Sequence, residues 1–167
     1  DQFWEDRPKL SEEPAFILEE KYAGESVADK LKRIREVMKE EGADIHILTT
    51  LDDICWTLNM RGNDIDFFPM VLSYAIVTMD GVELYIDERK LDDALKVKLA
   101  ADGVKLHPYN DIYEDVKKFA EDTVVMVDPG KLNYAIFNNI PENVKTIEQR
   151  NPAILMKAMK NPVEIKN

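Results

Sequence analysis

Apolar residues recur at helical spacing in one long segment that follows the first 25 residues. The positions that repeat every three or four residues are Val27, Leu31, Ile34 and Met38. This spacing predicts an amphipathic helix with one buried face. Ser26 and Asp29 form a capping-box pattern at its start, and Gly42 suits its end.

Short apolar runs then alternate with helical patterns through the rest of the chain. The runs that predict strands are 43–49, 73–78, 82–86, 104–107, 123–127 and 144–147. The patterns that predict helices are 51–58, 91–101, 112–120, 134–138 and 153–160. The turn at 79–81 joins two of the strands into a hairpin. We therefore predict an α/β fold with a mixed β-sheet flanked by helices on both faces.

The pattern divides the chain into three parts. Residues 1–25 contain Pro8, Pro14 and Gly24, which predict an extended arm or linker without regular elements. Residues 26–152 form the α/β domain. Residues 153–167 begin with a helix and continue into a second helix-start signal, with Asn161 as N-cap and Pro162 at the first position. We expect the sequence to be one domain of a longer protein.

The negative net charge of the chain argues against anionic partners such as nucleic acid. The chain carries 33 acidic and 22 basic side chains, for a net charge of −11. Such a surface repels a phosphate backbone or an anionic lipid unless a basic patch exists. The densest basic stretch, 30–35, reads as a solvated helix face of mixed charge. We predict no nucleic-acid partner and, without an apolar run of about 20 residues, no membrane partner; we expect a cytoplasmic protein.

Candidate metal ligands are weakly supported. Lone Cys55 offers neither a disulfide nor a thiolate site and is expected to be a buried, inert thiol. The carboxylates that could serve as metal ligands are Asp52, Asp53, Asp64, Asp66 and Asp128. Metal sites need convergent ligands, and no histidine stands at ligand spacing from these residues. We interpret Asp53 as a capping partner of Thr50, and Asp64 and Asp66 as polar residues of a loop. No metal site is predicted, and His46 and His107 are expected to be structural or surface histidines.

One dense stretch, 51–65, is the best candidate for function. Asn59 and Gly62 suit the end of a helix and a sharp turn, and Arg61 between them could reach carboxylates or carbonyls. Two interpretations stay open. Either Arg61 pins the loop and Trp56 fills the core, or these residues contact a substrate or another domain. The candidates for the second role are Trp56, Asn59, Arg61 and Asp64.

This stretch, continued through 66–69 to the strand at 73–78, resembles the non-catalytic domain that precedes the catalytic domain in aminopeptidase P, the Xaa-Pro aminopeptidases. The pattern is similar to that of the middle domain in the three-domain branch of the family. Further matches are Trp4, Arg7-Pro8, Tyr22-Ala23-Gly24, and Lys157-Ala158 through Lys160 to Ile165.

The resemblance implies a creatinase/aminopeptidase N-terminal-like domain with a ribonuclease-H-like sheet. It also implies a parent that hydrolyses the bond between an N-terminal residue and proline. The two metal ions of that chemistry, usually manganese, are held by a C-terminal catalytic domain, of which 153–167 would be the connecting helix and the start. The chain alone is then expected to hold no cofactor and no catalytic residue.

The resemblance further implies the partners of such a domain. They are its own C-terminal catalytic domain, further subunits of a homo-oligomer, and the peptide substrate of the parent, whose entrance the domain would help to shape. An alternative is a binding or assembly domain of a creatinase-superfamily relative with a different or lost activity. A third is an independent small-molecule-binding α/β domain.

Overall fold

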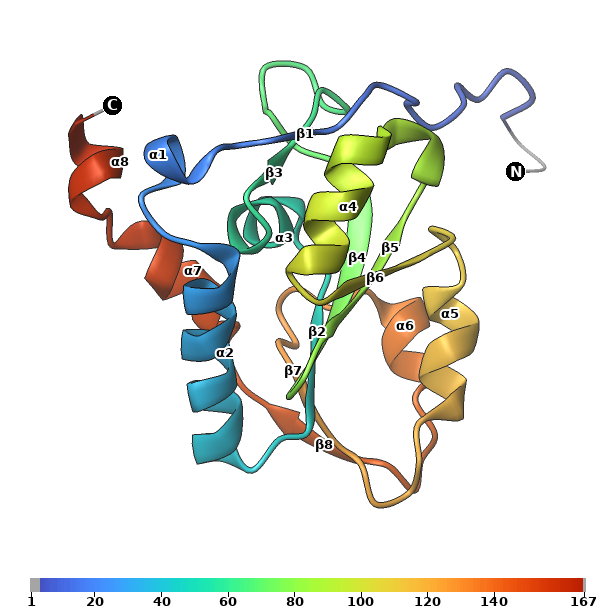
Figure 1. Ribbon diagram of the computed structural model, residues 1–167. Coiled ribbons are helices and arrows are strands. Elements are labelled where there is room, and N and C mark those ends of the chain that lie inside the picture. The colour runs from blue at the N-terminus through green and yellow to red at the C-terminus, as the bar shows by residue number, and fades with distance from the viewer. Residues whose placement is uncertain (1–3, 167) are drawn as a thin grey trace.

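A six-stranded mixed sheet forms the centre of the computed structural model, which describes residues 4–166. The strands in spatial order are β6 (Val104–His107), β5 (Val82–Ile86), β4 (Ser73–Thr78), β2 (Ile45–Leu48), β7 (Val124–Val127) and β8 (Lys145–Glu148). β4 runs antiparallel to both of its neighbours, and the other neighbouring strands pair in parallel. The predicted mixed sheet and its hairpin, β4–β5, are confirmed (Figure 1).

Helices cover both faces of this sheet (Figure 1). One core contains residues of α2 (Val27–Glu41), α3 (Leu51–Thr57), α4 (Asp93–Ala101) and α7 (Pro152–Ala158). The other core contains residues of α5 (Ile112–Asp115), the 3-10 turn η2 (Val116–Lys118) and α6 (Tyr134–Asn139). Alternation along β4 divides its side chains between the two faces: Ala75 and Val77 join the first core, and Ile76 joins the second. The expected helices on both faces are confirmed.

The long helix α2 shows how local signals set its bounds. Ser26 Oγ accepts a hydrogen bond from the backbone N–H of Asp29 at 3.0 Å. At the other end Gly42 adopts φ 70°, and its N–H donates to the carbonyl of Met38 and that of Lys39. Left-handed backbone is accessible to glycine without steric cost. Both predicted caps are confirmed, and the four apolar positions of the pattern are buried.

The N-terminal segment is more regular than the sequence predicts. Within 4–25, β1 (Phe16–Ile17) pairs antiparallel with β3 (Met60–Arg61), and α1 (Glu20–Ala23) ends at Gly24 in a left-handed conformation. The expectation of an arm without regular elements is wrong for these residues. The reason is that β1 takes its hydrogen-bond partners from a strand more than 40 residues away. A further 3-10 turn, η1 (Glu88–Lys90), also went unpredicted.

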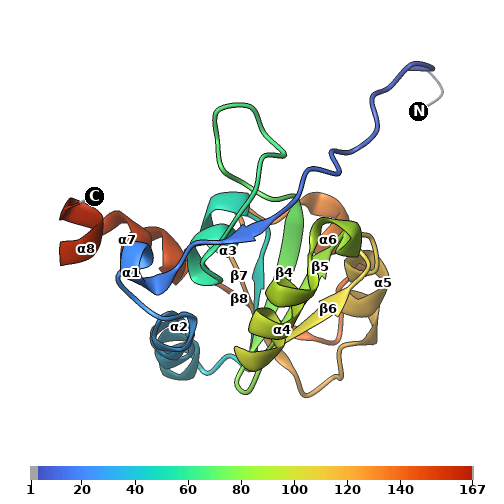
Figure 2. The ribbon, with the colours of Figure 1, turned by 45° about the horizontal axis from the view of Figure 1, so that its top comes forward.

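The C-terminal helix-start signal is confirmed by α8 (Pro162–Lys166). Asn161 Oδ1 accepts from the N–H groups of Val163 and Glu164, and Glu164 Oε2 accepts from Asn161 N at 3.0 Å. The Asn161 amide also donates to the carbonyl of Ala23 at 2.8 Å, so α8 lies against α1 (Figures 1 and 2). A side chain at Gly24 would collide with Asn161.

The expectations on residues 1–3 and on Asn167 lie outside the described residues. None of the helices within 4–166 is long and apolar enough to cross a membrane.

Candidate functional site

The segment 62–72, called here the projecting loop, stands out from the body between β3 and β4 (Figures 1 and 2). Backbone hydrogen bonds within the loop hold its shape. Phe68 N donates to the carbonyl of Ile65 at 3.1 Å, and Asp64 N donates to the carbonyl of Met70 at 3.1 Å. These bonds close a small hairpin within the loop, so its tip has a defined conformation.

The tip of the projecting loop presents aromatic side chains to solvent. Phe67 is fully exposed, and 61% of Phe68 is exposed. Phe67 also adopts φ 68°, a left-handed conformation that costs a non-glycine residue about 1–2 kcal/mol. Strained backbone of this kind concentrates at functional positions. The tip therefore combines two costly features, an exposed aromatic pair and a strained residue.

The base of the projecting loop is held by a buried ion pair. Lys90 Nζ lies 2.5 Å from Asp64 Oδ2, and both side chains are almost completely buried. The same carboxylate oxygen accepts from the backbone N–H of Leu72 at 2.6 Å. The interpretation of Asp64 as an ordinary loop residue is therefore wrong, since its partner lies 26 residues away on η1. Asp66, by contrast, is exposed.

Trp56 lies in the core at the end of α3, beneath two cations. Lys30 Nζ lies 4.4 Å from the centroid of the indole ring, and the guanidinium carbon of Arg33 lies 5.7 Å from it. Lys30 Nζ donates to the carbonyl of Trp56 at 2.8 Å and to Asn59 Oδ1 at 2.6 Å. The expectation of a solvated helix face is wrong for Lys30, because the carbonyl and indole ring of Trp56 and the amide of Asn59 replace water around it. Burial lowers the pKa of Lys30 to about 8.

Asn59 and Arg61 tie the start of the projecting loop to the body. Asn59 adopts φ 49°, and its Nδ2 donates to the carbonyl of Glu25 at 2.9 Å. Arg61 Nη1 donates to the carbonyls of Cys55 and Met60 at 2.8 and 2.9 Å. The geometry agrees with the interpretation in which Arg61 pins the loop and Trp56 fills the core. The substrate-access or interdomain role of Trp56, Asn59, Arg61 and Asp64 stays a prediction.

The remaining candidates are structural. Cys55 is buried, and burial raises the pKa of its thiol. His46 is buried, with Nδ1 3.0 Å from the carbonyl oxygen of Met126 and Nε2 3.2 Å from Asn151 Oδ1. His107 Nε2 lies 2.5 Å from Glu83 Oε2.

Asp53 is not the simple cap that the sequence indicates. The side chain of Thr50 makes no bond to the helix backbone; its hydroxyl donates to Asp53 Oδ2 at 2.5 Å. Asp53 also accepts from Asn151 and Lys157, at 2.8 and 2.7 Å. It therefore joins α3 to α7. Within residues 4–166 no three side chains of His, Cys, Asp or Glu are grouped to hold a metal ion.

Comparison with known proteins identifies the domain. Residues 6–164 match the creatinase/prolidase N-terminal domain family. The chain belongs to this family. As a creatinase/prolidase N-terminal domain, it is 37% identical over 162 residues to Xaa-Pro aminopeptidase 1 of Dictyostelium discoideum, covering 96% of this chain and 25% of the relative. It is 36% identical over 175 residues to a probable Xaa-Pro aminopeptidase P of Neurospora crassa, covering 99% of this chain and 26% of the relative.

A solved structure shows the same fold. The X-prolyl aminopeptidase of Caenorhabditis elegans, a cytosolic enzyme with a di-nuclear active site, superposes with a TM-score of 0.92 at 31% identity. The match covers 99% of this chain and 28% of the worm enzyme. The suspected family and the creatinase/prolidase-type fold are confirmed. The creatinase/prolidase N-terminal domain spans about a quarter of the length of the curated relatives described above.

Proposed function

We propose that this chain is a non-catalytic domain of a longer, metal-dependent Xaa-Pro aminopeptidase. The observation that carries the proposal is the coverage: aminopeptidases match nearly the whole chain, while the chain accounts for only 25–28% of their lengths. The parent would release the N-terminal residue from peptides with proline in second position. We infer a cytoplasmic location for the parent because the worm enzyme is described as cytosolic.

The metal centre of such an enzyme does not fit the residues of this domain. The worm enzyme has a di-nuclear active site, and a di-metal centre needs several convergent carboxylate or imidazole ligands. Such a group is lacking within 4–166. Two metal ions, which we expect to be manganese, would be held by the remainder of the parent, and we assign no step of hydrolysis to this chain.

We assign the projecting loop to the substrate entrance of the parent. Aromatic rings are the surface that proteins commonly use to pack against proline-containing segments. The exposed pair Phe67 and Phe68 offers such a surface, and the buried pair of Asp64 and Lys90 holds it in place. Asn59 and Arg61 would then act through the loop that they anchor, and Trp56 through its contact with Lys30, which also bonds to Asn59. Contacts with the catalytic domain and with other subunits belong to the same proposal.

The test compares this chain with a full-length protein that contains it. Release of the N-terminal residue from an Xaa-Pro peptide is measured with added Mn²⁺ and with a chelator. We expect activity only in the longer, metal-loaded protein. A longer protein that folds but cleaves no Xaa-Pro peptide would favour the binding or assembly alternative.

The loop is tested separately in the same full-length protein. Replacing both phenylalanines, Phe67→Ala with Phe68→Ala, should raise KM about threefold to tenfold, since one or two apolar contacts contribute about 1 kcal/mol or more. Tyr134→Ala on α6 is the matched control, because Tyr134 is also strongly exposed but lies outside the loop. Equal kinetics in both variants would remove the loop from the substrate entrance and leave the family assignment intact.

A further inference from the structure

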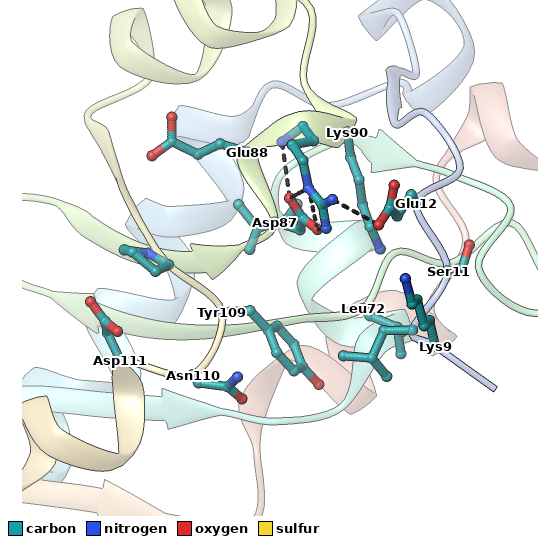
Figure 3. A pocket seen from close by; sticks show the side chains of 14 residues that line it. Lys9, Ser11, Glu12, Leu72, Asp87, Glu88, Lys90, Tyr109, Asn110 and Asp111 are labelled. Carbon is teal, nitrogen blue, oxygen red and sulfur yellow. Dashed lines mark hydrogen bonds and ion pairs between the residues drawn. The ribbon is translucent and has the colours of Figure 1, made fainter. Parts of the chain in front are cut away.

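A cavity of about 600 Å³ opens between the N-terminal segment, η1 and the loop that follows β6 (Figure 3). It lies at the carboxyl ends of the parallel strands β5 and β6. Crevices at this edge of α/β sheets commonly bind ligands. Its volume falls within the range of about 300–1,000 Å³ that is usual for small-molecule sites.

The middle of the cavity is apolar and aromatic. Leu72 contributes aliphatic surface, and Tyr109 stands between the two ends of the cavity (Figure 3). The Tyr109 ring stacks on Tyr74, with 5.0 Å between centroids and 25° between planes. Tyr74 in turn meets Tyr113 edge to face at 6.0 Å. Tyr109 is therefore a fixed aromatic wall, already positioned before any ligand binds.

Most charges around the cavity neutralise one another. Arg89 pairs with Asp87 at 2.5 Å and with Glu12 at 2.7 Å. Lys90 is committed to its buried partner Asp64. A ligand that carried only one sign of charge would therefore find little net attraction along the middle of the cavity.

The two ends of the cavity carry opposite, exposed charges, of which Asp111 also lies within electrostatic range of Lys118. Asp111 lies at one end in Figure 3 and Lys9 at the other, with Tyr109 between them. Through their side chains, neither residue forms a hydrogen bond or salt bridge with another residue of the described range 4–166, and both are exposed. The cavity thus offers an acceptor for a cation at one end, apolar surface in the middle, and a cation at the other end.

We propose that this cavity binds a short peptide with free termini. The peptide ammonium group lies against Asp111, its carboxylate lies against Lys9, and an apolar side chain packs on Leu72 and Tyr109. Of the common classes of small ligand, a peptide of a few residues combines these three features. The site consists of residues of this chain alone, so it does not depend on the proposed function.

The experiment titrates the ¹⁵N-labelled chain with the tripeptide Ala-Leu-Ala and follows backbone amide shifts. Three forms of the peptide are compared: free, N-acetylated and C-amidated. We expect shifts at Tyr109, Asn110 and Arg89, and about threefold to fivefold weaker binding when either terminus is capped, as for the loss of one partly exposed ion pair. Added salt should weaken binding of the free peptide.

Variants assign each terminus to one end of the cavity. In Lys9→Ala, amidation should no longer weaken binding, whereas acetylation should still do so; in Asp111→Asn the pattern should reverse. Lys39→Ala and Asp122→Asn are matched controls, because each removes one exposed charge elsewhere on the chain. Lys9 and Asp111 are exposed, so these variants leave the core intact. Equal binding of free and capped peptides, or shifts outside the cavity, would overturn the proposal.

Discussion

The tip and the base of the projecting loop reverse the usual distribution of side chains. At the base, the charged groups of Asp64 and Lys90 are buried. At the tip, Phe67 and Phe68 are exposed. Soluble proteins normally bury aromatic rings and solvate carboxylates and ammonium groups. The contrast shows that the loop is held by polar bonds at its root, which leaves its apolar side chains available for contact with another molecule.

The base of the loop should therefore determine the stability of the domain, and the tip should determine what the domain contacts. Changes at the base should unfold or loosen the domain, whereas changes at the tip should leave it folded, with at most a small change in stability.

Removing the buried carboxylate should give the largest loss of stability. Asp64→Ala leaves the ammonium group of Lys90 buried without a counter-charge, and we expect the free energy of unfolding to fall by about 3–5 kcal/mol. Urea denaturation followed by circular dichroism measures the change. Asp66→Ala is the control, since Asp66 is exposed two positions away.

The double variant Asp64→Leu with Lys90→Met sharpens the result. Replacing both charges with apolar groups should recover part of the loss, because a buried pair is often no more stabilising than apolar packing. If Asp64→Ala costs no more than Asp66→Ala, the base is not held by this pair, and the comparison fails.

The buried position of Lys30 predicts that the stability of the domain depends on pH. Burial lowers the pKa of Lys30 from an ordinary 10.5 to about 8 in the folded chain. Between these values the unfolded chain binds more protons, so stability should rise with pH. We expect a gain on the order of 1–3 kcal/mol between about pH 8 and pH 10 that is absent in Lys30→Met. Urea unfolding across this range measures it.

Lys39→Met is the control for the pH effect, because Lys39 lies on the same helix but is exposed. It should retain the full slope. If the Lys30→Met variant showed the same pH dependence of stability as the unsubstituted chain, Lys30 would not titrate between pH 8 and pH 10. That result would contradict the desolvated position of Lys30 beside Trp56.

At the tip, glycine should stabilise the domain. Phe67→Gly relieves a left-handed backbone, so the free energy of unfolding should rise by about 1 kcal/mol despite the flexibility that glycine adds to the unfolded chain. Phe67→Ala keeps the strain and should show no such gain. Thermal unfolding of the two variants, compared side by side, decides the point. Equal melting temperatures would mean that the strain at the tip is not costly.

The smallest effect should come from the neighbour of Lys90. Arg89 also pairs with carboxylates, but its side chain is largely exposed. Exposed pairs are weakened by water and salt. Arg89→Ala should therefore leave the urea midpoint unchanged within error, while Lys90→Ala lowers it clearly. A comparable loss in both variants would show that burial does not distinguish these adjacent cations.

Much of the fold can be predicted from the sequence, because its signals are local. The caps of α2 need only Ser26, Asp29 and Gly42, and the β4–β5 hairpin needs only its alternating strands and the turn between them. β1 and β3 could not be predicted, because a strand of two residues is too short to show an alternating pattern of apolar and polar side chains. Their pairing depends on contact between segments distant in the chain.

The candidate site could be predicted only in part, for a related reason. The dense stretch 51–65 contains the start of the projecting loop, and the geometry explains Asn59 and Arg61 as anchors of that loop. The partners of Lys30 and Asp64 lie 26 to 29 residues away. A charged residue in a helix or a loop carries no local sign that such a partner will bury it. The aromatic tip could not be predicted, because neither the exposure of Phe67 and Phe68 nor the left-handed backbone of Phe67 has a local signal in the sequence.

The contact between Gly24 and Asn161 constrains how this domain can diverge. Gly24 has no room for a side chain, and the Asn161 amide fills that space while bonding to the carbonyl of Ala23. A mutation at either position alone would carry a fitness cost wherever the junction of α1 and α8 matters. Across descendants of a common ancestor, we therefore expect positions 24 and 161 to change together or not at all.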